Sequence, residues 1–267
     1  MNQATALRRR HLCYVRLLGL CVLLMIGFAL PGRWSRVTAI GYNLLPLVMI
    51  RGLSEPLGFS LFGAWDRLLY RLLGLAALLS GLTWYLTPLS FRSTGVLLLL
   101  LWTLFVGWST LRLVMGLAYE RRVNARVLMG AFAGYLLIGL TAGLLFSAIE
   151  SIHSGSFSSF HADVSRHLPL DDLMAASGSQ PVWQLNFVRL NYFAFVSLTT
   201  VGFGDIAPLT PQAQMASVAV SVIGTLYLAV VMGLLISRTT VQVEESPGDP
   251  IHRGPRRHSS SDGDHSC

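Results

Sequence analysis

The segment with the clearest chemistry is Thr199 to Asp205, which reads TTVGFGD. Its two glycines stand at alternating positions and permit backbone angles that are closed to other residues. Successive carbonyl oxygens can therefore point to one side of the chain, and the Thr200 hydroxyl can add an oxygen below them. Four such strands around an axis would give stacked rings of oxygens that replace the water shell of an ion. Because the motif occurs once, we expect a homotetramer.

The stretch that leads into this motif, from Leu190, is short. Its apolar part is about ten residues long, too short for a helix that crosses a bilayer. We expect the segment to enter the membrane from one side, turn and return. A re-entrant segment of this kind is tolerated only where protein or a water-filled cavity surrounds it.

The composition indicates a membrane protein. Of the 267 residues, 53% are hydrophobic and only 12% are charged, whereas soluble domains carry about 25% charged residues. The net charge is +7 and every basic residue is arginine. The arginines stand between apolar runs, as topology determinants do, so we expect no nucleic-acid partner. The three cysteines show no spacing typical of zinc or of a disulfide framework, and we expect no cofactor.

Six apolar runs can cross a lipid bilayer. They cover residues 17–32, 37–53, 71–91, 94–119, 127–149 and 213–236. Six spans put both termini on one side, and with that side cytoplasmic fifteen arginines lie inside and five outside. This bias favours cytoplasmic termini. The polar residues 150–185 then form an outward-facing loop.

The motif resembles the selectivity filter of potassium channels, whose familiar form is TTVGYGD. An aromatic-rich segment with Tyr192, Phe193 and Phe195 precedes it like a pore helix. Ile206-Ala207-Pro208 follows, as in many prokaryotic members of that family, and then comes one long apolar span. The resemblance covers about residues 127–238.

The resemblance implies a role for each residue of the filter. Potassium ions would bind the backbone carbonyls of Thr200, Val201, Gly202 and Phe203 and the Thr200 hydroxyl. Three residues would support the filter, namely Thr199, Gly204, which completes the outer turn, and Asp205, which makes the entrance negative. The Phe203 ring would point into packing, and without a tyrosine hydroxyl the filter would be less rigid. Gly224, twenty residues past Gly204, is a possible gating hinge, although a packing role is as good an interpretation.

The predicted fold is therefore an all-α membrane protein. It has six transmembrane helices, with a re-entrant pore helix and a selectivity-filter loop between the last two. The expected parts are a cytoplasmic N-terminus (1–16), a four-span N-terminal membrane region (17–126), a potassium-channel pore domain (127–237) and a disordered cytoplasmic tail (238–267). The arginine-only usage and the short tail favour the plasma membrane of a bacterium.

The first four spans differ from those of voltage-gated channels, whose fourth span carries arginines at every third position. Here the fourth span holds only Arg112, which we expect to snorkel to the inner surface. Steep gating needs several charges within the field, so we expect weak voltage dependence or none. In the outer loop, His153, His161 and His167 stand among aspartates, and solvated histidines are a commoner outcome there than a proton or metal sensor.

The predicted function is passive potassium transport. One alternative is a poorly selective monovalent cation channel, because changes within the G-x-G element alter selectivity. A second is a non-conducting membrane sensor or scaffold that retains a pore module. A membrane enzyme is disfavoured, because we find no set of paired carboxylates, metal ligands or nucleophile and base at membrane depth.

Overall fold

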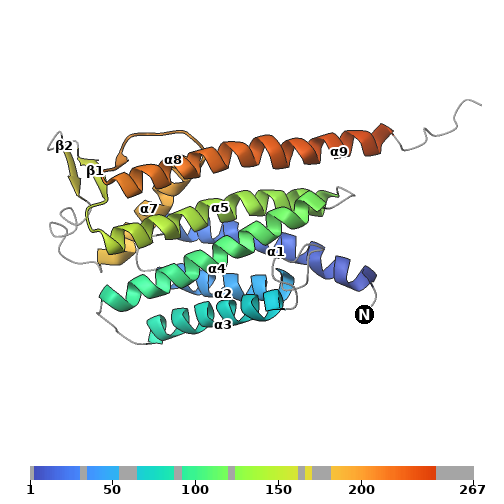
Figure 1. Cartoon of the computed structure of the whole chain (residues 1–267), viewed down its shortest axis with the longest axis horizontal. Coiled ribbons are helices and arrows are strands. Elements are labelled where there is room, and N and C mark those ends of the chain that lie inside the picture. The colour runs from blue at the N-terminus through green and yellow to red at the C-terminus, as the bar shows by residue number, and fades with distance from the viewer. Residues whose placement is uncertain are drawn as a thin grey trace, which may run out of the picture.

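The protein is an elongated bundle of helices with a small sheet at one end (Figure 1). The structure, a computed structural model, describes residues 3–30, 35–53, 65–86, 92–119, 124–161, 166–169 and 182–244. Five long helices come first: α1 (Gln3–Ala29), α2 (Ser35–Leu53), α3 (Trp65–Leu86), α4 (Arg92–Tyr119) and α5 (Ala125–Ile152). Then follow β1 (Phe157–His161), β2 (Arg166–Pro169), α7 (Val182–Leu198), β3 (Ile206–Pro208), α8 (Pro211–Leu226), a π-helix (Tyr227–Met232) and α9 (Gly233–Glu244).

The last three elements form one continuous helix, which we call the inner helix. It begins at Thr210, whose side chain accepts a hydrogen bond from the Ala213 amide, and Pro211 occupies the first helical position. Both are typical of helix starts. The inner helix runs to Glu244, past the predicted boundary at residue 238. The rest of the predicted tail, residues 245–267, lies outside the described residues.

Four of the described helices are long and apolar enough to cross a membrane. The spans cover Leu12–Ala29, Gly95–Ala118, Ala125–Ile152 and Pro211–Arg238. This agrees with the prediction of a mostly helical chain with several spans. The remaining two helices of the bundle, α2 and α3, have 19 and 22 residues, so the number six stays a prediction.

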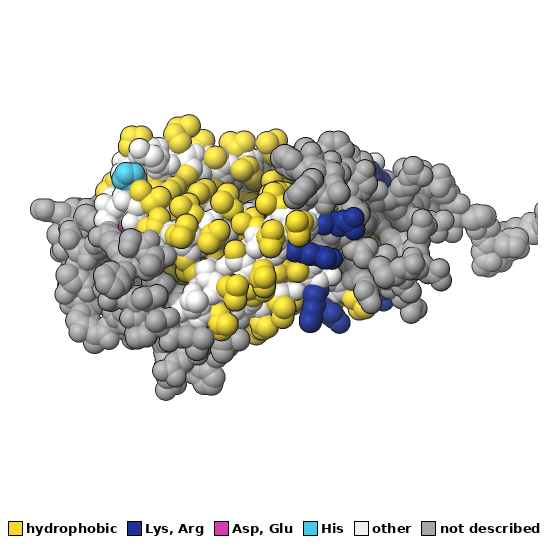
Figure 2. Space-filling model, turned by 60° about the horizontal axis from the view of Figure 1, so that its bottom comes forward, with side chains coloured by type: hydrophobic (Ala, Val, Ile, Leu, Met, Phe, Trp, Pro, Cys, Tyr) yellow, Lys and Arg dark blue, Asp and Glu magenta, His cyan; other side chains and the backbone are white. Residues whose placement is uncertain are grey.

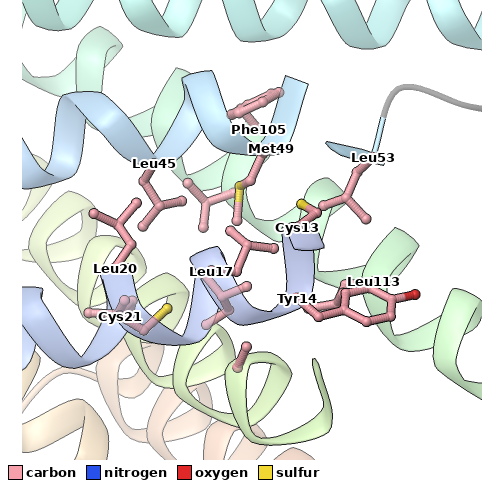
Figure 3. Packing of buried hydrophobic residues seen from close by; sticks show 14 of the residues in the cluster. Cys13, Tyr14, Leu17, Leu20, Cys21, Leu45, Met49, Leu53, Phe105 and Leu113 are labelled. Carbon is pink, nitrogen blue, oxygen red and sulfur yellow. The ribbon is translucent and has the colours of Figure 1, made fainter. Parts of the chain in front are cut away.

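The core of the N-terminal region is formed by buried side chains of α1 to α5. Figure 3 shows Leu20 of α1 turned toward Leu45 of α2, and Leu17, Cys21 and Met49 belong to the same cluster. All five are buried. The apolar side chains that remain exposed, such as those of α3, lie on the outer surface, as expected where lipid surrounds a helix.

Helix α5 lies at the centre of the bundle and receives large side chains at four glycines, which we call the notch glycines. A Cβ atom at any of them would overlap a side chain of another helix. The pairs are Gly130 with Tyr14 of α1, Gly134 with Tyr227 of the inner helix, and Gly139 and Gly143 with Phe195 and Asn191 of α7. Small residues spaced by four let helices approach closely in membranes. The notch glycines thus set α1, α7 and the inner helix against α5.

The three strands correct the prediction of an all-α chain. They form one antiparallel sheet in the order β2-β1-β3, in which β1 and β2 belong to the predicted outer loop and β3 follows the segment Thr199 to Asp205. The strands have three to five residues each, too short to produce a recognisable alternating pattern. Their pairing depends on α5 and α7 bringing both segments to the same end of the bundle.

Candidate ion-binding site

The segment Thr200 to Gly204 has an alternating backbone. Thr200, Gly202 and Gly204 have φ values of +58°, +59° and +79°, while Val201 and Phe203 between them keep negative φ. Among the described residues Thr200 is the only non-glycine with positive φ. A β-branched residue in this region is a genuine outlier, and such outliers cluster at functional sites. Alternation of this kind turns successive carbonyls toward one side, unlike a regular strand.

The start of this segment is anchored to the C-terminus of α7. The Thr200 amide donates to the Ser197 carbonyl over 3.1 Å, and the Val201 amide donates to the Val196 carbonyl over 3.1 Å. The Thr199 hydroxyl donates to the Phe195 carbonyl over 2.7 Å. The position of this predicted filter, Thr199 to Asp205, which we call the filter from here on, is therefore fixed by the position of α7.

The filter residues are exposed within a single chain. Val201 is 53% and Phe203 68% exposed, although both are large apolar residues beside a buried helix. A Cβ at Gly202 or Gly204 would meet no atom within 4 Å. These glycines are therefore required by their backbone angles and not by crowding, and one side of the segment has no neighbour in its own chain.

The outer end of the filter contacts Tyr192 of α7. The rings of Tyr192 and Phe203 are stacked, with centroids 6.4 Å apart and an angle of 2° between their planes. The Asp205 side chain lies close enough to the Tyr192 side chain to interact with it electrostatically. We expected the missing hydroxyl of Phe203 to leave the filter less rigid, and Tyr192 offers a hydroxyl from the neighbouring helix instead.

The segment that leaves the filter is held by the sheet. Strand β3 pairs with β1, so that Ser158 lies opposite Ala207, and the Leu209 amide donates to the Ser156 carbonyl over 2.7 Å. The turn before β1 is in turn fixed by Glu150 at the end of α5. Its carboxylate accepts hydrogen bonds from the amides of Gly155 (2.8 Å) and Phe157 (3.0 Å). Both ends of the filter are thus tied to the body of the chain.

Gly224 lies directly under the C-terminus of α7. A Cβ at this position would overlap the carbonyl oxygen of Leu198, a backbone atom that cannot move aside. One helical turn earlier, the Ser221 hydroxyl donates to the Ser197 carbonyl over 2.8 Å. This geometry favours the packing interpretation of Gly224, and its role as a hinge stays a prediction.

The two interpretations of Gly224 make different predictions. We expect Gly224→Ala to destabilise the protein by about 1–3 kcal/mol, the usual cost of overpacking. The matched control is Gly233→Ala, nine residues further along the same helix, where a Cβ would meet no atom within 4 Å. Thermal unfolding of the purified protein in detergent measures both. An unchanged unfolding temperature with an altered open probability would instead identify Gly224 as a hinge.

Arg112 does not lie at the surface as predicted. Its guanidinium is buried, forms an ion pair with Asp66 of α3 and donates to the carbonyl of Leu53, the last residue of α2, over 3.0 Å. It also lies 4.4 Å from the ring centroid of Tyr70. The sequence placed the arginine correctly in the fourth helix, but the acid that pairs with it is 46 residues away.

The outer-loop residues considered for a proton or metal sensor lie mostly outside the described residues. The backbone register places His161 opposite Arg166 and His167 opposite Phe160. The part of the chain that the structure describes holds no cluster of three or more metal-ligating side chains.

Comparisons with known proteins agree with this site. Residues 156–241 match the family model described as an ion channel. A stretch of 47 residues is 47% identical to the voltage-gated delayed rectifier potassium channel KCNH5 of Homo sapiens, which is 18% of this chain and 5% of that protein. A stretch of 73 residues is 38% identical to the voltage-gated inwardly rectifying potassium channel KCNH6 of Rattus norvegicus. It covers 24% of this chain and 8% of that protein. The chain spans less than a tenth of the length of these relatives.

These matches support an ion-channel domain at residues 156–241 of a multi-pass membrane protein. They point to a channel and not to an enzyme. The matched range contains the filter and most of the inner helix, and it begins one residue before β1.

Proposed function

We propose that this protein is a potassium-selective channel that conducts the ion passively across the cell membrane. The observation that carries the proposal is the alternating backbone of Thr200 to Gly204. Carbonyl oxygens of Thr200, Val201, Gly202 and Phe203 coordinate the ion, with the Thr200 hydroxyl as a further ligand. The names of the similar proteins, both potassium channels, support the choice of ion.

The working assembly is a homotetramer. One strand of carbonyls supplies only one side of a coordination shell, and rings of four are needed to replace bound water. The exposure of Val201 and Phe203 in the single chain fits this requirement, because neighbouring subunits would cover them. The exposed apolar face of the inner helix, including Met215, Val218 and Val222, supplies further contact surface.

The chain crosses the membrane six times, with both termini in the cytoplasm. In Figure 1 the N-terminal end of α1 and the C-terminal end of α9 lie at one end of the bundle, and the sheet lies at the other. On the face in Figure 2, the basic side chains gather at one end of a broad apolar surface. Exposed arginines of the predicted cytoplasmic set are Arg16, Arg51, Arg67, Arg71 and Arg126. This agrees with the positive-inside rule.

Reconstitution of the full chain into liposomes tests the function. With potassium on one side and sodium on the other, the reversal potential should lie close to the equilibrium potential of potassium. A reversal potential near zero would favour the poorly selective cation channel. Absence of flux from a properly inserted tetramer would favour the non-conducting sensor or scaffold.

We expect the open probability to change little between −100 and 0 mV. Moving one charge through 100 mV supplies about 2.3 kcal/mol, whereas separating a buried ion pair costs about 3–5 kcal/mol. The field is therefore too weak to pull Arg112 from Asp66, and the other charged residue of α4, Arg92, stands at the first position of the helix. Single-channel recording over this voltage range measures the effect. A steep rise in open probability would show that another charge senses the field.

A further inference from the structure

The N-terminal helices and α7 meet in a cluster of four aromatic rings. The rings belong to Phe28 of α1, Tyr42 of α2, Trp102 of α4 and Phe187 of α7. Phe187 forms pairs with Phe28 and Tyr42. Tyr42 lies at its centre, with ring centroids 5.3 Å from Phe187, 5.8 Å from Trp102 and 6.0 Å from Phe28. Such centroid distances are those of favourable aromatic pairs. The N-terminal half of α7 is thus packed against helices that lie outside the matched channel domain.

Within this cluster one polar contact joins α2 to α7. The Tyr42 hydroxyl donates a hydrogen bond to Oδ1 of Asn191 over 3.2 Å. Asn191 is fully buried, and its Nδ2 donates to the Phe187 carbonyl one turn earlier over 2.8 Å. A buried amide that loses a partner leaves a desolvated polar atom, which is costly. The hydrogen bond therefore specifies one rotational setting of α7 in a way that apolar packing alone does not.

The other sides of Asn191 are also enclosed. The side chain occupies the notch at Gly143 of α5, and Phe195, one turn further, occupies the notch at Gly139. Asn191 is separated from Thr199 by eight residues, or about 12 Å along a helix. Because the filter begins at the C-terminus of α7, a rotation of α7 about its axis displaces the filter carbonyls directly.

We propose that Tyr42 and Asn191 are positioning residues for the filter, and that the N-terminal four-helix region holds the pore helix of its own chain through this contact. The inference rests on the proposed function and deepens it, because it assigns to the N-terminal region a part in ion selectivity. The supporting role requires no movement of charge, so it is compatible with weak voltage dependence.

The test compares Tyr42→Phe with Tyr70→Phe in the full chain. Tyr70 is the matched control, because it is a buried tyrosine of the same region whose hydroxyl bonds Ser109 over 2.9 Å and does not touch α7. Hydrogen exchange of the backbone amides should become about two- to tenfold faster in α7 and the filter in Tyr42→Phe, the factor expected for one lost net hydrogen bond. Exchange there should be unchanged in Tyr70→Phe.

A double-mutant cycle identifies the partner. In an Asn191→Leu background, Tyr42→Phe should have no further effect on exchange in α7, because the acceptor is already gone. If Asn191→Leu does not fold, the comparison of Tyr42→Phe with Tyr70→Phe decides alone. Exchange in α7 that is the same in both tyrosine variants would overturn the proposal.

Ion permeability separates this inference from the proposed function. In liposomes, Tyr42→Phe should raise the permeability of sodium relative to potassium, and Tyr70→Phe should leave the ratio at the wild-type value. An unchanged ratio in Tyr42→Phe, with a selective wild-type channel, would contradict the positioning role and not the function. A wild-type protein without flux would contradict the function, and hydrogen exchange would still decide on the support of α7.

Discussion

Potassium flux should be abolished by the substitution Gly202→Asp. Gly202 has a φ of +59°, and a side chain in this left-handed region costs about 1–2 kcal/mol. The strain favours a return to negative φ, which would turn a carbonyl away from the proposed ion path. In the proposed tetramer the new carboxylate would also add four charges to the ion path. Flux of potassium from loaded liposomes measures the effect, and we expect none above that of empty vesicles.

The control for this substitution is Gly155→Asp. Gly155 has a φ of +80° and, like Gly202, would place a Cβ in open space. It lies in the turn between α5 and β1, so the two variants carry similar backbone strain at different places. We expect Gly155→Asp to retain flux. Equal loss in both variants would show that the effect arises from general destabilisation.

The second large effect should follow from Asp66→Asn. This change leaves the Arg112 guanidinium buried without its counterion, and breaking a buried pair in this way costs about 3–5 kcal/mol. We expect a corresponding loss in the free energy of unfolding, measured by thermal or chemical denaturation in detergent. The loss should exceed that of any single surface substitution, because those remain within about 0.5 kcal/mol.

Two further variants test the origin of this loss. Arg71→Met removes an exposed arginine from the same helix as Asp66 and should leave the stability nearly unchanged. The double variant Asp66→Leu/Arg112→Met should recover most of the stability that Asp66→Asn loses, because replacing both members of a buried pair with apolar residues is often neutral. A double variant as unstable as Asp66→Asn would show that the remaining contacts of Arg112, to Leu53 and Tyr70, dominate.

The filter could be predicted from sequence because its chemistry is local. Two glycines, a threonine and an acid within seven residues specify the backbone that the structure shows, and no distant partner is needed. The inner helix could also be predicted, since its apolar length and the Thr210-Pro211 start are contained in one continuous stretch. The backbone of the motif and the final span were therefore predicted before their arrangement was known, and the role of the motif as a filter stays a prediction.

The supports of the filter could not be predicted in this way. Tyr42 and Asn191 are 149 residues apart, and Arg112 and Asp66 belong to different helices. A tyrosine or an asparagine inside an apolar run carries no sign of its partner. The notch glycines were equally ambiguous, because a glycine in a membrane helix is common and only the opposing side chain reveals its purpose.

The notch glycines make α5 a template for its neighbours. Each notch accepts one side chain of a particular shape. Together the four notches contact side chains of three helices, namely α1, α7 and the inner helix. A chimaera that received α5 from another pore would therefore keep its spans and its filter motif but lose the fit of the helices around them. Such an exchange should succeed only when the side chains that occupy the four notches are transplanted with it.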